Sequence, residues 1–355
     1  MISTSLKLIS IALLPLFLFG CSSNPVGDGG VFRSDDQGET WAQKVFVGKT
    51  SKGEVRIDQL AVKRFVEHPT REDTLYLLAG DGVYVTTNDG EQWDKLPLNA
   101  NAVALAIDPS LPDTMYLSTG TQIVKTVNAG TSWEVVYQDS QGRQVTHVLV
   151  DPQNSNRILA FLTTPTVLIS RNAGTEWSQL SELPVKSYAR EVVRSPVNPN
   201  MLYSITEANQ FLRSGNGGEL WEDLTEPMRA SMRGLGLLKN LQVTVSGRIY
   251  LGSNRTLLTS SDEGSQWSVI PTLLSEESTL TVYIVDPQNP EIIYFADGRT
   301  VHRTTNAGKT WETLETYPSS RMITSLSLKR GTLGQVIFAG AASVPEKKNP
   351  YFPFL

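Results

Sequence analysis

The residues of this sequence that could do chemistry are three histidines, one cysteine and carboxylates scattered along the chain. His68, His147 and His302 lie far apart, and no two of them have the spacing of metal ligands. Because Cys21 is the only cysteine, no thiol pair is available for a metal or a disulfide. The sequence contains neither a Gly-x-Ser-x-Gly nucleophile turn nor a phosphate-binding loop. We therefore expect no catalytic residue, no metal and no cofactor.

One short motif contains the repeated Asp and Asn residues and ends in each of the seven tryptophans. It reads Ser/Thr-x-Asp/Asn-x-Gly-x-x-Trp, and we call it the Trp motif. Successive copies are about 40 to 52 residues apart, in the range of propeller blades and similar arrays. Its recurring residues are Asp36, Gly38 and Trp41; Asn88, Gly90 and Trp93; Asn128, Gly130 and Trp133; Asn172, Gly174 and Trp177; Asn216, Gly218 and Trp221; Asp262, Gly264 and Trp267; and Asn306, Gly308 and Trp311.

The chemistry of the Trp motif favours a tight turn over a metal site. An Asp or Asn side chain can accept a hydrogen bond from the backbone N–H two residues on, and Gly allows a positive φ. The Trp ring is suited to packing between neighbouring sheets. Asn replaces Asp in five of the seven copies, and a neutral amide is a poor substitute at a cation site. We expect these residues to be structural.

The sequence around each motif predicts four short strands per unit. β-Branched and aromatic runs alternate with Pro, Gly, Asn and Asp turns, and the motif lies between the third and fourth strands. In most units the first two strands are joined by a Pro turn, where His68 occupies the position of an Asp or Asn and therefore looks structural.

The two ends of the repeat region determine the number of units. The first motif has only the last two strands of a unit, and residues 322–340 have only the first two. Six whole units and two complementary halves predict an all-β, seven-bladed propeller of four-stranded antiparallel blades. One blade would be closed by N- and C-terminal strands, which removes exposed sheet edges.

The Trp motif resembles the Asp-box, or BNR repeat, of sialidases, sortilin-type receptors, xyloglucanases and photosystem II stability/assembly factors. The resemblance covers about 300 residues and implies the propeller fold, not an activity. A sialidase would carry an Arg-Ile-Pro motif, which is missing, and a xyloglucanase would have two propellers. Carboxylates such as Asp58, Asp81 and Asp297 lie near expected strand ends, so a sialidase-like glycosidase or a carbohydrate-binding propeller remains the alternative function.

The first residues read as a secretory signal. Lys7 precedes an apolar run of about a dozen residues that ends at Gly20-Cys21, which is short for a membrane span. Leu-Phe-Gly-Cys resembles a bacterial lipobox and implies lipidation of Cys21, with Ser22 favouring the outer membrane. The expected organisation is a lipoprotein signal peptide at 1–20, a lipidated tether at 21–30, the propeller at 31–341 and a Pro/aromatic tail at 342–355.

The face opposite the motif turns is the expected binding face. It consists of the links between blades and the turns between second and third strands, most of which are short and favour a flat surface. A longer link, at 222–241, could form a helix near residues 227–233 that exposes Met228 and Met232. Arginines in these segments would form a basic patch if they converge, and would otherwise be ordinary solvated surface. They are Arg56, Arg190, Arg229, Arg233, Arg255, Arg299 and Arg321.

These observations together predict a membrane-anchored, non-enzymatic protein-binding propeller of the bacterial cell envelope. It would act as an assembly factor, a receptor or an accessory subunit of an extracytoplasmic complex, and the propeller would be a monomer. The net charge of −5 and the lack of basic runs argue against nucleic acid as a partner. The expected partners are the membrane, through the N-terminal lipid, and one or more envelope proteins.

Overall fold

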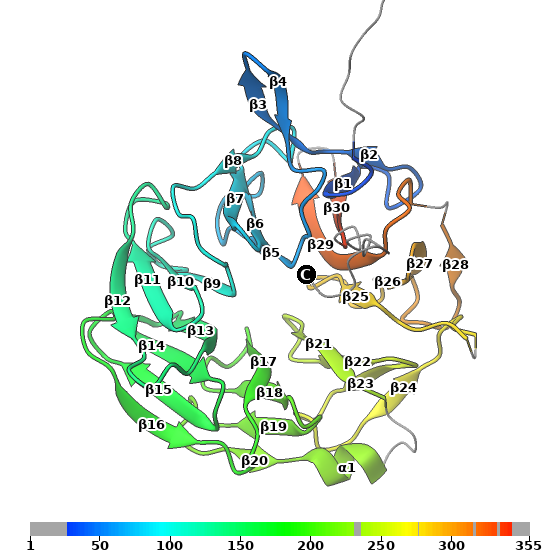
Figure 1. The fold of residues 1–355 in the computed structure, drawn as a ribbon. Coiled ribbons are helices and arrows are strands. Elements are labelled where there is room, and N and C mark those ends of the chain that lie inside the picture. The colour runs from blue at the N-terminus through cyan, green and yellow to red at the C-terminus, as the bar shows by residue number, and fades with distance from the viewer. Residues whose placement is uncertain (1–26, 231–235, 276, 315–316, 332–333, 343–355) are drawn as a thin grey trace, which may run out of the picture.

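The computed structural model describes residues 27–230, 236–275, 277–314, 317–331 and 334–342 of this chain. The expected signal peptide, Cys21 and nearly all of the expected C-terminal tail lie outside the described residues. Seven four-stranded antiparallel sheets surround a common axis, which confirms the seven-bladed propeller predicted from the sequence (Figure 1).

The strands of each blade are given in order from the innermost to the outermost. Blade 1 contains β5 (Arg64–Glu67), β6 (Leu75–Ala79), β7 (Gly82–Thr86) and β8 (Asp94–Lys95); blade 2 contains β9 (Ala104–Ile107), β10 (Met115–Ser118), β11 (Gln122–Thr126) and β12 (Glu134–Gln138). Blade 3 contains β13 (Val145–Asp151), β14 (Asn154–Leu162), β15 (Thr166–Ser170) and β16 (Ser178–Glu182); blade 4 contains β17 (Ala189–Arg194), β18 (Leu202–Thr206), β19 (Phe211–Ser214) and β20 (Glu222–Asp223). Blade 5 contains β21 (Leu238–Val243), β22 (Ile249–Ser253), β23 (Leu257–Ser260) and β24 (Ser268–Ile270); blade 6 contains β25 (Val282–Val285), β26 (Ile293–Asp297), β27 (Thr300–Thr304) and β28 (Glu312–Thr313).

Blade 7 closes the ring with strands from both ends of the repeat region. Its order is β29 (Ile323–Gly331), β30 (Gly334–Ala341), β1 (Val31–Ser34) and β2 (Ala42–Gln43) from the inside outward. β1 and β30 pair antiparallel, with Val31 opposite Gly340 and Ser34 opposite Ile337. The two half units of the sequence therefore complete one sheet, as predicted.

The hydrophobic core is divided into seven layers, each between two neighbouring blades. Every layer combines buried residues from both sheets and includes one Trp of the Trp motif, either buried or packed at its edge. Trp267 of blade 5, for example, meets the ring of Phe211 from blade 4 edge to face, with 5.0 Å between ring centroids. The indole N–H of Trp93 donates to the carbonyl of Lys44 in the preceding blade (2.9 Å). Each Trp therefore joins its blade to the preceding one.

The Trp motif folds into the same hydrogen-bonded turn in all seven blades. In blade 7 the Ser34 hydroxyl donates to Asp36 Oδ1 and accepts from the N–H of Gly38, and Asp36 Oδ1 also accepts from the N–H of Thr40. The side chain of the third residue thus bonds the N–H four residues on, rather than two residues on as the sequence suggested. The other six copies repeat these three bonds.

Two consecutive residues of each turn have a positive φ, whereas the sequence indicated only the glycine. The residue before the glycine also lies in the left-handed region, with φ between 53° and 70°. These residues are Gln37, Asp89, Ala129, Ala173, Gly217, Glu263 and Ala307. A side chain in this region costs about 1–2 kcal/mol, so the hydrogen bonds of the turn must offset local strain in six of the seven blades.

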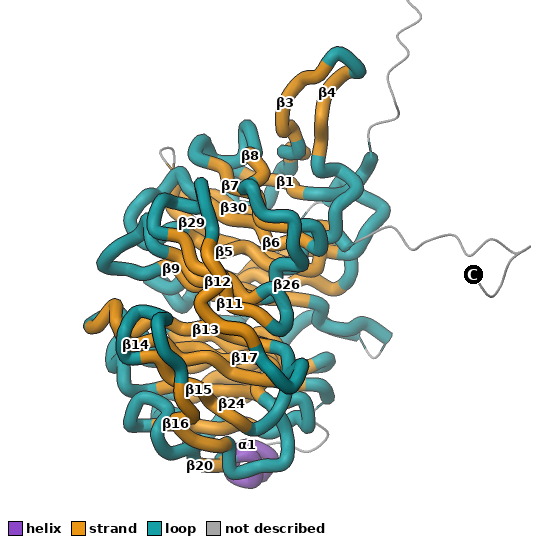
Figure 2. The backbone as a smooth tube through the Cα atoms, turned by 60° about the vertical axis from the view of Figure 1, so that its left-hand side comes forward, coloured by secondary structure: helices purple, strands orange, loops and turns teal. Residues whose placement is uncertain are grey.

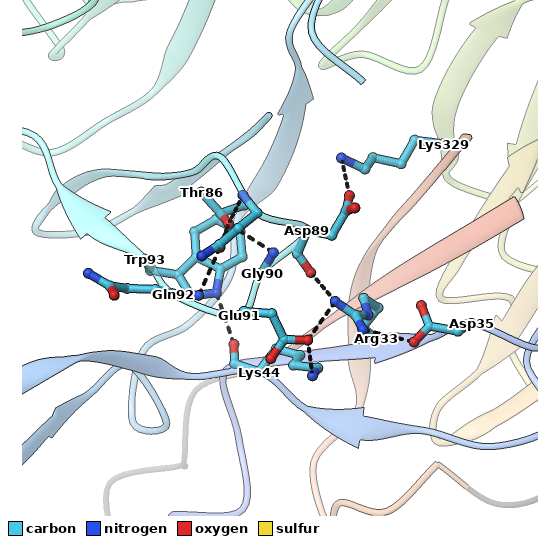
Figure 3. A network of polar contacts seen from close by, with 11 residues as sticks. Arg33, Asp35, Lys44, Thr86, Asp89, Gly90, Glu91, Gln92, Trp93 and Lys329 are labelled. Atoms are coloured by element: carbon cyan, nitrogen blue, oxygen red, sulfur yellow. Dashed lines mark hydrogen bonds and ion pairs between the residues drawn. The ribbon is translucent and has the colours of Figure 1, made fainter. Parts of the chain in front are cut away.

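A basic side chain immediately before the Trp motif links four of the blades to the next one. It donates to the carbonyl of the residue that precedes the motif glycine there. These pairs are Arg33 with Asp89 (2.6 Å), Lys125 with Ala173 (3.0 Å), Arg213 with Glu263 (3.2 Å) and Arg303 with Gln37 (3.0 Å). Figure 3 shows the junction of blades 7 and 1, where Lys44 and Arg33 also pair with Glu91 and Lys329 pairs with Asp89.

Two segments depart from the regular blade. Between β2 and β5 the chain forms a hairpin of β3 (Phe46–Thr50) and β4 (Gly53–Arg56), which stands out from the ring (Figure 2). Between β20 and β21 it forms α1 (Thr225–Ala230). The expected exposure of Met228 on this helix is wrong, since the side chain is buried against Leu238 and Leu241. Met232 lies outside the described residues. No helix of the described ranges is long and apolar enough to cross a membrane.

The motif turn predicts a large loss of stability for Gly264→Ala. Gly264 has a φ of +87°, and a Cβ there would lie 2.5 Å from Cε1 of Phe211. Backbone strain and overpacking together should lower the free energy of unfolding by about 2–4 kcal/mol, measured by chemical denaturation. Gly142→Ala is the control, because Gly142 also has a positive φ but no atom within 4 Å of the added Cβ. We expect a loss of only about 1 kcal/mol there, and equal losses would contradict the packing argument.

Candidate binding site

The seven innermost strands line a central channel that contains three cavities. All seven run in the same direction, from the face made by the links between blades (the link face) to the face that carries the Trp motif turns (the motif face). A cavity of about 370 Å³ lies where the strands begin, and one of about 420 Å³ follows along the same strands. The third, about 610 Å³, lies at the motif face. We call the first one the mouth cavity.

Two adjacent cations, Lys63 and Arg64, lie at the mouth cavity on the first inner strand. Lys63 donates to Asn101 Oδ1 and to the carbonyl of Ala102, and burial lowers the pKa of its ammonium group. Arg64 is exposed to the cavity, and its guanidinium forms no hydrogen bond or ion pair with the described part of the chain. Its five N–H donors are therefore available to an anionic ligand.

Two more cations, Arg190 and Lys239, lie near the beginnings of β17 and β21. Arg190 donates to the carbonyl of Leu238, and Lys239 donates to the carbonyl of Leu280. Burial, and then the charge of Arg190, lower the pKa of Lys239. Arg190 also lies 3.8 Å from a carboxylate oxygen of Glu207, which is half exposed. The bond to a neutral carbonyl positions Lys239 without neutralising it, whereas Arg190 is partly balanced by Glu207.

Glu191 is the carboxylate among the residues that line the mouth cavity. Its Oε1 accepts from the N–H of Asn240 (2.9 Å), and its Oε2 accepts from the N–H of Leu241 (2.8 Å). Both oxygens are therefore engaged in joining blade 4 to blade 5. Lys63 and Arg64 line the mouth cavity with Glu191, and Arg190 and Lys239 lie beside it with Glu207, so cations outnumber carboxylates at this entrance of an acidic chain.

Buried polar groups surround this entrance. Burial, reinforced by the charge of Arg64, lowers the pKa of His147 to about 3, so the imidazole is neutral at physiological pH. The hydroxyl of Tyr283 is buried without a hydrogen-bond partner among the described residues, and burial raises its pKa well above the ordinary value. A low-dielectric wall strengthens the interaction of the nearby cations with a bound anion.

The motif-face end of the channel has a different chemistry. Glu67 lines both cavities there, and burial raises the pKa of its carboxyl group although Ser327 donates to it (2.9 Å). Asp286, in the same large cavity, accepts from the N–H groups of Gln288 and Asn289 and from Gln335. Across the described ranges no group of three or more His, Cys, Asp or Glu residues could hold a metal ion.

The structure places the arginines expected at the binding face in different surroundings. Arg190 is the one beside the channel entrance. Arg56 pairs with Glu54 on the hairpin (2.6 Å), and Arg229 lies 3.6 Å from Glu226 on α1. Arg255 and Arg299 are exposed in the turns that follow β22 and β26. Arg321 is buried and pairs with Asp28 (3.1 Å), and Arg233 lies outside the described residues.

Sequence reasoning missed Lys63, Arg64 and Lys239 because it searched the links and turns rather than the inner strands. A signal was present, since these residues lie at the beginnings of the expected innermost strands, where some side chains must face the channel.

His68 and His302 have structural roles. The Nδ1 atom of His68 accepts from the N–H of Arg71 (2.9 Å), as Asp108 does from Leu111 in the equivalent turn of blade 2.

Comparisons with solved structures agree with this fold. YCF48 bound to a D1 peptide is similar with a TM-score of 0.61 and 13% identity, covering 80% of this chain and 94% of that one. A GH74 xyloglucanase from Xanthomonas campestris has a TM-score of 0.63 and 17% identity, covering 85% of this chain and 52% of that one. The GH74 enzyme of Niastella koreensis has a TM-score of 0.64 and 15% identity, covering 84% and 53%.

These identities show the fold alone, and the chain spans about half the length of the two GH74 proteins. The similar structures include a peptide-bound protein and GH74 enzymes, so the comparisons leave the activity of this chain open. No family model matches the sequence, and a search of curated proteins finds no match.

The neutral state of His147 predicts a specific dependence of stability on pH. As the pH falls from about 6.5 toward 3, the unfolded chain gains a proton that the folded chain does not bind. The stability of the wild type relative to His147→Gln should therefore fall by up to about 1.4 kcal/mol per pH unit in this window. Denaturation curves at several pH values check this, and a constant difference between the two proteins would contradict it.

Proposed function

We propose that this chain is a non-enzymatic protein-binding propeller that captures an acidic segment of a partner at its link-face channel entrance. The observation that carries the proposal is the excess of cations around the mouth cavity, above all the unpaired guanidinium of Arg64. A propeller of the same fold, YCF48, is found with a peptide bound, which supports peptide recognition on this scaffold. An assembly factor, a receptor or an accessory subunit would all use such a surface.

We further propose that the protein is a lipoprotein of the bacterial envelope that belongs with the Asp-box, or BNR repeat, propellers. The seven Trp motifs support the repeat assignment, and the apolar run before Cys21 supports export and lipidation. Lipid chains at Cys21 would give stable attachment to the membrane, with the outer membrane favoured. The partner would then be an envelope protein with an accessible acidic segment.

Replacement of Cys21 tests the anchor. Cys21→Ser removes the thiol that would carry the lipid, so the protein should move from the membrane fraction to the soluble fraction of the envelope. Fractionation and immunoblotting of cells that express each form would measure this. Equal retention of the variant in membranes would rule out lipid anchoring at this residue.

Charge reversal at the channel entrance tests the binding site. Lys63→Glu combined with Arg64→Glu should weaken partner capture at least about tenfold, because a carboxylate on the partner would meet like charge. Quantitative co-purification after crosslinking in membranes would measure capture. Lys309→Glu is the control, since this exposed lysine lies in a motif turn on the opposite face. Undiminished capture by the double variant, with thermal unfolding unchanged, would contradict the proposed site.

A glycoside hydrolase is the second candidate function, and Glu67 is the observation that favours it. A carboxyl group with a raised pKa in a cavity is suited to general acid catalysis, and GH74 enzymes share the fold. Two features argue against it. Asp286 is already engaged by three donors, and no Trp, Tyr or Phe is among the described residues that line the two cavities containing Glu67. Glucan hydrolysis that disappears in Glu67→Gln would favour the enzyme.

A further inference from the structure

The β3–β4 hairpin projects from the ring beside the point where the described chain begins. The N–H of Gly27 donates to Asp58 Oδ2 (2.7 Å), just beyond the end of β4, and the amide of Gln43 donates to the carbonyl of Gly27 (2.7 Å). Gly27 is therefore held at the base of the hairpin, whose strands stand clear of the seven sheets (Figures 1 and 2).

The hairpin is anchored only at its base. The carbonyl of Phe46 accepts from the N–H of Trp93 (2.9 Å), and the N–H of Ile57 donates to the carbonyl of Val45 (2.9 Å). Beyond this point β3 pairs with β4 alone, and residues 49–56 are exposed. Neither core packing nor ring closure explains this extension, because the layer between blades 7 and 1 is complete without its tip.

The tip of the hairpin is basic on a chain whose net charge is −5. Lys49, Lys52 and Arg56 face a single acidic residue, Glu54, which pairs with Arg56 (2.6 Å) and lies 4.0 Å from Lys49. The side chain of Lys49 is 74% exposed, and Lys52 forms no ion pair with any described residue. Residues 46–56 thus carry a net charge of +2, with Lys49 and Lys52 at the projecting end and Arg56 opposite Phe46 at the base.

The length of the chain before Gly27 brings this tip within reach of a bilayer. Five residues lie between Cys21 and Gly27, and a fully extended chain covers at most about 21 Å over the six steps from one to the other. The longer arm of the hairpin has five residues and therefore measures about 17 Å. A lipid at Cys21 would hold the hairpin base no farther from the membrane than roughly one hairpin length.

We infer that the β3–β4 hairpin is a second membrane contact, which places Lys49 and Lys52 against anionic phospholipid headgroups and fixes the orientation of the propeller on the bilayer. This inference rests on the proposed anchoring at Cys21. A basic side chain near an anionic bilayer surface strengthens contact by about fivefold at physiological ionic strength. That is too weak to recruit a free protein, but it is sufficient to orient one that is already tethered.

The test supplies the tether artificially. The chain from residue 21 onward, with a hexahistidine tag in place of Cys21, is held on vesicles that contain a nickel-chelating lipid. Ser51→Cys at the hairpin tip is then the only thiol and carries a fluorophore, whose quenching by a headgroup-labelled lipid reports contact. The control carries the label at Glu219→Cys in blade 4, across the ring from the hairpin (Figure 1).

We expect stronger quenching at residue 51 on vesicles with anionic phospholipid than on zwitterionic ones, with the difference removed by high salt. Lys49→Glu combined with Lys52→Glu should lower the equilibrium constant for contact between the hairpin and the membrane at least about 25-fold. Equal quenching on both lipids, an unchanged double variant, or equal quenching at residue 219 would overturn the inference. Because the tag replaces the lipid, such a failure is distinct from a failure of lipidation at Cys21.

Discussion

Apolar packing between neighbouring sheets is the interaction on which this structure depends. Each blade is too small to bury its own faces, so every buried layer is shared by two blades, and the ring is stable only when the last layer is complete. The motif turn secures each layer from one end. Its glycine lets the turn approach the ring of Phe211 or Phe338 in the preceding blade, and its Trp extends over the same layer. The strain of the left-handed residue before the glycine, in the six blades where it is not itself a glycine, is the cost of this close approach.

The same arrangement determines where function can lie. Because the core is between blades, the channel-facing side chains of the innermost strands are not needed for packing and can vary in chemistry. In this chain they form a cationic entrance, a more apolar middle that includes Leu149 and Ile284, and a motif-face end, with Glu67 lining both of the latter. The entrance lies on the face where the described chain begins, since Asp28 is bound there by Ser320 and Arg321. A lipid tether would therefore keep the entrance near the membrane.

The repeat made the fold predictable from the sequence, whereas the residues of the binding site could be recognised only from their arrangement in space. Seven copies of one motif and two complementary ends were sufficient to predict the blade number and the closing sheet. The turn was predicted less well, because the left-handed conformation of Ala173 or Glu263 cannot be inferred from residue types that rarely adopt it. The buried Met228 shows the same limit, since a helix in a link was expected to face solvent.

The binding site was harder to predict, because which side chains converge at the channel entrance depends on the register of the paired strands. Lys63 lies more than a hundred residues before Arg190 and Lys239 in the sequence, and the ring brings all three to one entrance. Arg190 and Arg321 are the same residue type and look alike in the sequence. Arg190 nevertheless lies at the entrance, whereas Arg321 is buried against Asp28. Only the pairing of strands distinguishes an arginine that is available to a partner from one that holds the N-terminal segment.

Site-specific photocrosslinking from the channel entrance would test the central claim most directly. A photoreactive amino acid at Thr324, an exposed residue that lines the mouth cavity, would be compared in living cells with the same group at Val245, an exposed residue in the turn after β21. We expect a defined envelope protein to be crosslinked from Thr324 through an acidic segment, and not from Val245. Crosslinks to the same proteins from both positions, or none from Thr324, would contradict the account.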